Sequence, residues 1–123
     1  MIRPETAAAL AKALPHRFIW LPQHNVLRLS TDGQHRTGGP CVDAFLDTPL
    51  HHGLVVAALH AECDARGWGW TQRTLRGEEG TGHIGRVWVL EDEAEEARYL
   101  GVETAPSELQ ALADAVLAAL ETL

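Results

Sequence analysis

Short apolar blocks alternate with turn-forming residues along the chain, and their spacing predicts both helices and strands. Pro4–Leu14 is rich in alanine, begins with a proline suited to a first helical turn and stops at Pro15, so it predicts a short helix. Arg17–Leu21 and Val26–Ser30 are short β-like runs on either side of a Pro-Gln-His-Asn segment, a pattern typical of a hairpin. The stretch from Cys41 to Asp47 is ambiguous.

A longer helix is predicted from Thr48-Pro49 to about Arg66. The Thr48 hydroxyl can cap the helix, and Pro49 stands where a missing N–H costs nothing. Gly67 supplies the left-handed residue with which many helices end. A stripe of apolar and small residues at helical spacing predicts the face that packs on a sheet, and it consists of Leu50, Leu54, Ala57, Ala58, Ala61 and Ala65.

Beyond this helix the pattern changes to alternation, which predicts strands. Trp68–Leu75 and Ile84–Leu90 form a hairpin across a long glycine-bearing loop, Arg76–His83, and Arg98–Glu103 predicts a third strand. Trp68, Trp70 and Trp88 are predicted core residues rather than an aromatic binding platform, because each removes a large apolar area from water.

A final helix begins at Thr104 or Ala105, with Pro106 in its first turn, and continues to about Glu121. The element order is then α-β-β-α-β-β-β-α over a single domain, residues 1–123. Sequential strands joined by turns imply antiparallel pairing. We therefore predict an α+β fold in which an antiparallel four- to five-stranded sheet is packed by two or three helices.

Composition and charge restrict the class of protein. The 123 residues are 46% hydrophobic, which fits a compact domain, and no apolar run approaches the ~20 residues that span a bilayer. With no secretory signal visible, we expect a cytoplasmic protein without a membrane partner. The net charge of −7 is uneven, with +2 on residues 1–76 and −9 on residues 77–123. An acidic half repels phosphate, which argues against nucleic-acid binding.

Two sets of residues are candidate binding sites. The acidic run after the second predicted hairpin strand suits a basic protein partner, and its members are Glu91, Asp92, Glu93, Glu95 and Glu96. In the second helix His60 and Cys63 lie three residues apart, close enough to share a metal ion with His52 or another histidine. A zinc site commonly needs four ligands in paired short spacings, so the pattern favours a buried thiol beside solvent-facing imidazoles.

Gly80, Gly82 and Gly85 spell the G-x-G-x-x-G pattern of dinucleotide-binding proteins. That chemistry needs a helix after the glycines, whose N-terminus meets the pyrophosphate. The residues that follow alternate and are β-branched, so they predict a strand. We therefore interpret the glycines as a flexible hairpin loop and expect no cofactor.

From Gly67 onward the chain resembles the phage ABA sandwich domain family. The resembling features are Gly67-Trp68-Gly69-Trp70 after a helix, Val87-Trp88-Val89 in a strand, and Glu103-Thr104-Ala105-Pro106 before an Ala/Leu helix, and Asp47-Thr48-Pro49 is compatible. The resemblance covers about residues 45–123. It implies a small α/β sandwich in a phage or prophage accessory protein, and it brings no catalytic or ligand residues.

No flanking sequence activates a nucleophile or separates the pKa values of an acid–base pair. The sequence therefore favours a non-catalytic accessory protein that binds a protein partner through its acidic C-terminal half or by self-association. One alternative is a metal-binding, possibly hydrolytic protein that uses His60, Cys63 and another histidine. A second is an enzyme whose site is assembled across the fold without a linear motif.

Overall fold

The computed structural model describes residues 2–30, 40–77, 80–90 and 97–123. Within these residues the helices are α1 (Pro4–Ala13), α2 (His52–Ala65) and α3 (Glu108–Glu121), with short 3-10 turns at Pro22–His24 and Pro49–His51. The strands are β1 (Phe18–Leu21), β2 (Val26–Ser30), β3 (Cys41–Phe45), β4 (Gly69–Gly77), β5 (Gly80–Leu90) and β6 (Ala97–Ala105). No helix in the described ranges is long and apolar enough to cross a membrane.

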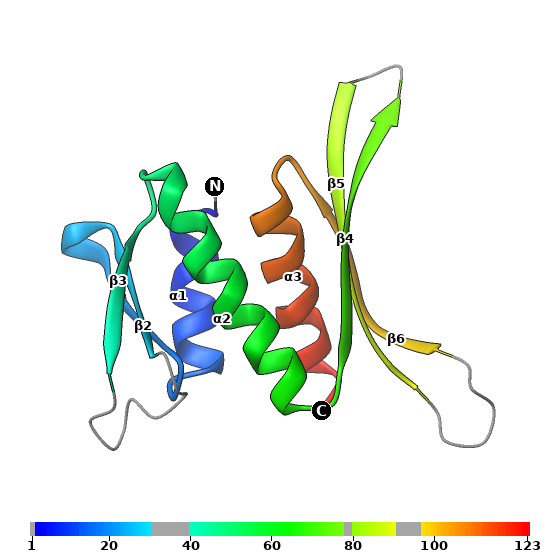
Figure 1. The fold of residues 1–123 in the computed structure, drawn as a ribbon, viewed down its shortest axis with the longest axis horizontal. Helices are drawn as coiled ribbons and strands as arrows, with labels where there is room; N and C mark the ends of the chain where they lie inside the picture. The colour runs from blue at the N-terminus through cyan, green and yellow to red at the C-terminus, as the bar shows by residue number, and fades with distance from the viewer. Residues whose placement is uncertain (1, 31–39, 78–79, 91–96) are drawn as a thin grey trace.

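The elements form three layers, with the helices between two sheets (Figure 1). Helix α1 packs on β1, α3 packs on β4, β5 and β6, and α2 contacts strands of both sheets. The core lies on both sides of this helical layer. Its fully buried large side chains include Leu10, Leu14, Phe18, Leu27, Leu59, Val87, Leu112 and Val116.

The structure confirms the α+β class and the antiparallel pairing but divides the sheet. Two three-stranded sheets, β1-β2-β3 and β4-β5-β6, replace the single four- to five-stranded sheet that we predicted, and the order is α-β-β-β-α-β-β-β-α. The additional strand is β3, from the ambiguous stretch. The sequence of β3 lacks a clear alternation of apolar and polar residues, because the apolar Phe45 is exposed. The charged Asp43 is accepted in the strand because it forms an ion pair with Arg28 on β2.

The predicted Arg76–His83 loop is wrong, because the β4–β5 ladder extends to the pair Gly77 and Gly80. Gly80, Gly82 and Gly85 all lie in β5, so they are not a flexible loop. The strand that continues after Gly85 confirms that the helix needed for dinucleotide binding does not follow. Backbone pairing with β4 therefore outweighs the low β propensity of glycine here.

The predicted buried stripe of α2 is also wrong, except at Ala58. Leu50, in the turn before the helix, is 89% exposed, and Leu54, Ala57, Ala61 and Ala65 are exposed as well. The buried face instead consists of Val55, Ala58, Leu59, Glu62 and Cys63. The helix is rotated because a charged residue, Glu62, finds partners in the interior and so occupies a core position.

Both predicted helix starts need correction. Thr48 makes no side-chain cap, and Pro49 opens a 3-10 turn before α2 begins at His52. Strand β6 continues to Ala105, so Pro106 precedes α3 instead of lying in its first turn. Ser107 is the cap, and its hydroxyl accepts a hydrogen bond from the Gln110 N–H at 3.1 Å. At the other end of α2, Gly67 has a φ of 71°, as predicted for a helix C-terminus.

Candidate binding site

The outer face of the second sheet carries a group of exposed and half-buried aromatic and aliphatic side chains that point to the same side. Cross-strand pairing places one set of alternating residues on the same side, away from α3. The inner side is fixed by Gly85 and Gly101, because a Cβ on either residue would collide with the backbone of α3. We call the outer set the aromatic face, defined by Thr71, Arg73, Ile84, Arg86, Trp88, Leu90, Tyr99, Val102 and Thr104.

Trp88 is the centre of the aromatic face. Its indole lies over Gly69, where a Cβ would collide with the ring, so the glycine of β4 makes room for the tryptophan of β5. Tyr99 meets this indole edge-on, with ring centroids 6.3 Å apart and planes at 67°. The Arg86 guanidinium lies 6.0 Å from the centroid of the Tyr99 ring. The prediction that Trp88 belongs to the core is wrong, whereas Trp68 is buried and Trp70 packs against the core.

Solvent reaches much of this surface. The exposed fractions are 63% for Leu90, 55% for Tyr99 and 46% for Val102. Soluble proteins scatter exposed apolar residues singly, whereas a group of them on one face marks a contact surface. Tryptophan, tyrosine and arginine are also the residue types that dominate the energy of protein interfaces.

The charge of the aromatic face differs from that of the chain. Arg73 and Arg86 are its charged members, and neither forms an ion pair with any residue that the structure describes. The outer face of the first sheet differs, because Arg28 donates to Asp43 at 2.8 Å and the two charges compensate each other. The hydrogen bond from Arg28 also holds the pKa of Asp43 below its ordinary value. Among the described residues, the outer face of the second sheet therefore presents arginines without ion-pair partners beside apolar side chains, whereas the outer face of the first sheet pairs Arg28 with Asp43.

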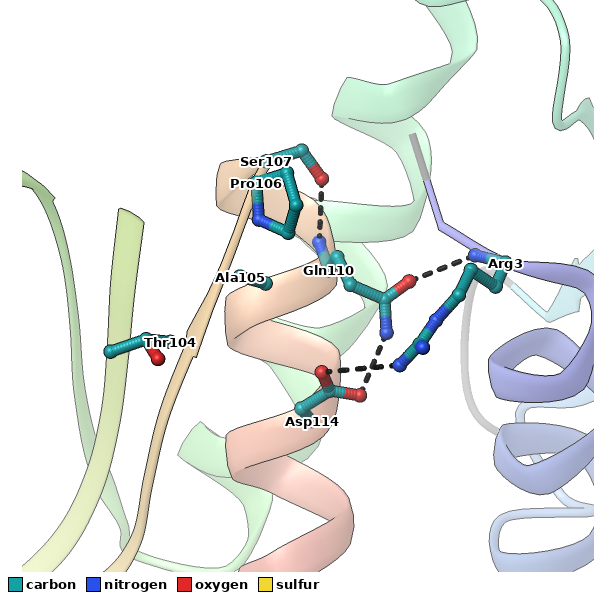
Figure 2. Close-up of a pocket in the computed structure, with 7 residues that line it drawn as sticks. All are labelled: Arg3, Thr104, Ala105, Pro106, Ser107, Gln110 and Asp114. Atoms are coloured by element: carbon teal, nitrogen blue, oxygen red, sulfur yellow. Dashed lines mark hydrogen bonds and ion pairs between the residues drawn. The ribbon is translucent and has the colours of Figure 1, made fainter. Parts of the chain in front are cut away.

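The cavity in Figure 2 lies between the N-terminal segment and α3, and a hydrogen-bond network in its wall connects the two. Gln110 is buried there, and its Oε1 accepts from the Arg3 backbone N–H at 2.8 Å. Its Nε2 donates to Thr6 Oγ1 at 2.8 Å and to Asp114 Oδ1 at 2.7 Å. Since every polar atom of the amide has a partner, the network holds α1 against α3 and leaves no amide group for a ligand.

The candidate metal ligands His60, Cys63 and His52 do not come together in the described structure. The His60 ring stacks on Trp70, and Cys63 is fully buried in the core. Burial, with the nearby carboxylates of Asp64 and Glu62, raises the pKa of Cys63 to about 12, which disfavours the thiolate that a metal requires. In the described part of the chain no group of three or more histidine, cysteine or acidic side chains could hold a metal ion.

His52 lies elsewhere, in a cavity that sequence reasoning missed. His52 on α2 and His83 on β5 line it together with Glu108 at the start of α3. His52 Nε2 and His83 Nδ1 are buried without a hydrogen-bond partner among the described residues, and His83 Nδ1 lies 3.9 Å from Glu108 Oε1. Two imidazoles and one distant carboxylate do not complete a metal site, so this cavity carries no assignment.

Sequence reasoning found little of the aromatic face. The acidic partner-binding candidates Glu91, Asp92, Glu93, Glu95 and Glu96 lie outside the described residues. Tyr99, Arg86 and Val102 were not singled out, although alternation along β5 and β6 carries the signal. No family model, curated protein or solved structure matches the chain. The resemblance to the phage ABA sandwich family therefore stays a prediction.

Proposed function

We propose that this protein is a non-catalytic accessory protein that binds another protein through the aromatic face. The observation that carries the proposal is the packing of Trp88, Tyr99 and Arg86 on an uncovered sheet surface. Rigid aromatic side chains supply large contact areas, and little conformational entropy is lost when they are buried. The surrounding threonines offer hydroxyls for a polar rim.

Charge complementarity defines the chemistry of the partner. Arg73 and Arg86 have no ion-pair partner among the described residues, and the chain has a net charge of −7, so the proposed binding surface differs in sign from the molecule as a whole. The matching partner is a protein segment with aliphatic or aromatic residues in its centre and carboxylates around them. The acidic run near residues 91–96 remains a separate sequence-based prediction for a basic partner.

Selection of displayed peptides on the purified protein tests this proposal. We expect enrichment of peptides that combine Asp or Glu with apolar residues, and weaker binding of those peptides as salt rises. Tyr99→Ser and Arg86→Gln should reduce binding about tenfold or more, a loss of about 1.4 kcal/mol. Ile19→Ser, at another exposed apolar position on the outer face of the first sheet, is the control.

Four results would overturn the proposal. Selected peptides could lack acidic residues, they could bind the Tyr99 and Arg86 variants as well as the wild type, or sedimentation could show that the aromatic face is covered by a second copy. The last result assigns the surface to self-association instead. Single-stranded oligonucleotides serve as a further probe, because aromatic sheet faces also stack bases, and their binding would contradict the protein-partner assignment.

A further inference from the structure

A groove between α2 and the first sheet contains a buried guanidinium at the edge of an apolar surface. Its volume is about 230 Å³, and its lining residues come from α2, β2 and β3 together with the residue before β1. The α2 side consists of Leu54, Ala57, Ala58 and Ala61. Leu54, Ala57 and Ala61 face outward, whereas Ala58 lies at the border with the buried face that contains Glu62.

Arg17 provides the polar end of the groove. The Arg17 side chain is only 9% exposed, and its backbone is fixed by the Ser30 N–H, which donates to the Arg17 carbonyl at 2.8 Å. Nε of Arg17 donates to Glu62 Oε1 at 3.1 Å. The structure shows no further side-chain partner for this guanidinium among the residues that it describes. The guanidinium has four more N–H donors at its terminal nitrogens.

The positive charge around Glu62 exceeds the negative charge. The same carboxylate accepts from His16 Nε2 at 2.6 Å and from Arg66 Nε at 3.1 Å. One carboxylate is therefore shared by two guanidiniums and an imidazole, and the cluster carries at least one net positive charge. The surplus charge lies on Arg66, whose side chain is 29% exposed, whereas the buried Arg17 keeps terminal N–H donors from which an anion in the groove can accept hydrogen bonds.

We propose that this groove binds a small alkyl monocarboxylate. The carboxylate accepts two parallel hydrogen bonds from the terminal nitrogens of Arg17, which match its planar geometry. The alkyl chain lies along Leu54, Ala57 and Ala61, removing apolar surface from water. The groove is smaller than the ~300–1,000 Å³ typical of drug-sized ligands, so a short chain fits it better than a long one.

Titration with hexanoate, followed by NMR amide shifts, tests the proposal, with 1-hexanol and hexylammonium as probes of the same length. We expect saturable hexanoate binding with the largest shifts at Ala57, Ala61 and Arg17, and at least about tenfold weaker binding of both other probes. Equal binding of hexanoate and hexanol would show that Arg17 does not recognise the carboxylate. Shifts confined to other regions would place the ligand elsewhere.

Two variants separate the groove from the stability of the protein. Ala61→Phe fills the groove from an exposed helix position, and we expect it to weaken hexanoate binding at least about tenfold. Ala65→Phe, one turn further along α2 and outside the groove lining, should leave binding unchanged. Unchanged binding in the Ala61 variant, or equal loss in both, would overturn the proposal. Arg17→Gln should abolish the preference for hexanoate over hexanol even if the protein is less stable.

Discussion

The imidazole of His60 stacks on the indole of Trp70, with ring centroids 3.4 Å apart and planes only 6° from parallel. This contact joins α2 to β4, so it connects the helical layer to the second sheet. Both residues lie at the border of the core, where Trp70 also directs its Nε1 toward Asp64 Oδ1 at 3.4 Å.

The stack predicts a pH-dependent stability. Burial lowers the pKa of His60, and the opposite effects of Gln72 and of the Asp64 charge are smaller. The folded protein therefore binds a proton at His60 less readily than the unfolded chain does. As the pH drops below the ordinary histidine pKa of ~6.5, the free energy of unfolding falls, and it continues to fall until the pH is below the pKa of His60 in the folded protein. Urea denaturation at one pH above this range and one pH below it measures the difference in unfolding free energy. His60→Gln should flatten the pH dependence, and an unchanged slope in that variant would contradict the assignment.

Glu62 is predicted to be the most sensitive polar position in the described structure. Glu62→Gln leaves Arg17 buried without its counter-charge, and breaking a buried pair in this way costs about 3 kcal/mol of unfolding free energy. Chemical denaturation measures the loss. Asp43→Asn breaks the exposed pair with Arg28 and should change the unfolding free energy far less. Similar losses in the two variants would show that the Glu62 cluster contributes no more than a surface pair.

The Glu62 cluster also predicts how the protein responds to acid. Burial alone raises the pKa of Glu62, but hydrogen bonds from His16, Arg17 and Arg66 outweigh it and hold the pKa below its ordinary value. Its contribution to stability is therefore complete above the ordinary pKa and is lost as pH falls through the lower, folded value. Unfolding curves of wild type and Glu62→Gln should converge in this acidic range, and a constant difference down to that range would argue against the shift.

Two glycines of β5 should differ sharply in their tolerance of a side chain. A Cβ on Gly85 would lie 2.6 Å from the Ala111 carbonyl oxygen in α3, whereas a Cβ on Gly82 has no neighbour within 4 Å. Gly85→Ala must push the helix away from the sheet and should cost about 2 kcal/mol or more. Gly82→Ala should stay within about 0.5 kcal/mol of wild type. Thermal or urea denaturation compares them, and equal stability would refute the close approach of α3.

Cys63 should resist alkylation while the protein is folded. Its thiol is fully buried, and with a pKa of about 12 it has almost no thiolate at pH 8. Mass spectrometry after iodoacetamide treatment should show no label on Cys63 in native buffer and full labelling in denaturant. Cys41 lies exposed on β3 and provides an internal comparison. Rapid native labelling of Cys63 would mean that α2 opens readily.

The sequence predicts local structure better than burial in this protein. Periodicity locates the hairpin of β1 and β2, the strands of the second sheet and both long helices, because those signals act within one element. It places the wrong face of α2 inside, because apolar spacing ignores partners that are distant in sequence. Glu62 is buried since His16 and Arg17, about 45 residues away, neutralise it. No helical pattern within α2 could reveal those contacts.

The aromatic face shows the same limit in a sheet. Tryptophan is predicted to be buried because of its size, yet Trp88 stays at the surface because Gly69 on the neighbouring strand provides a shallow place for its ring. The register that brings these two residues together is a property of strand pairing. On the opposite side of the sheet, α3 packs closely against Gly85 and Gly101. The requirement for glycine at these positions follows from which face the helix covers, and that is not visible in the sequence of the strands.

Placing the helices in the middle layer turns the uncovered faces of the two sheets in opposite directions (Figure 1). A molecule held by one sheet is therefore screened by the helical layer from a molecule held by the other, and neither displaces its counterpart by direct contact. A partner bound at the proposed aromatic face would therefore leave the outer face of the first sheet accessible.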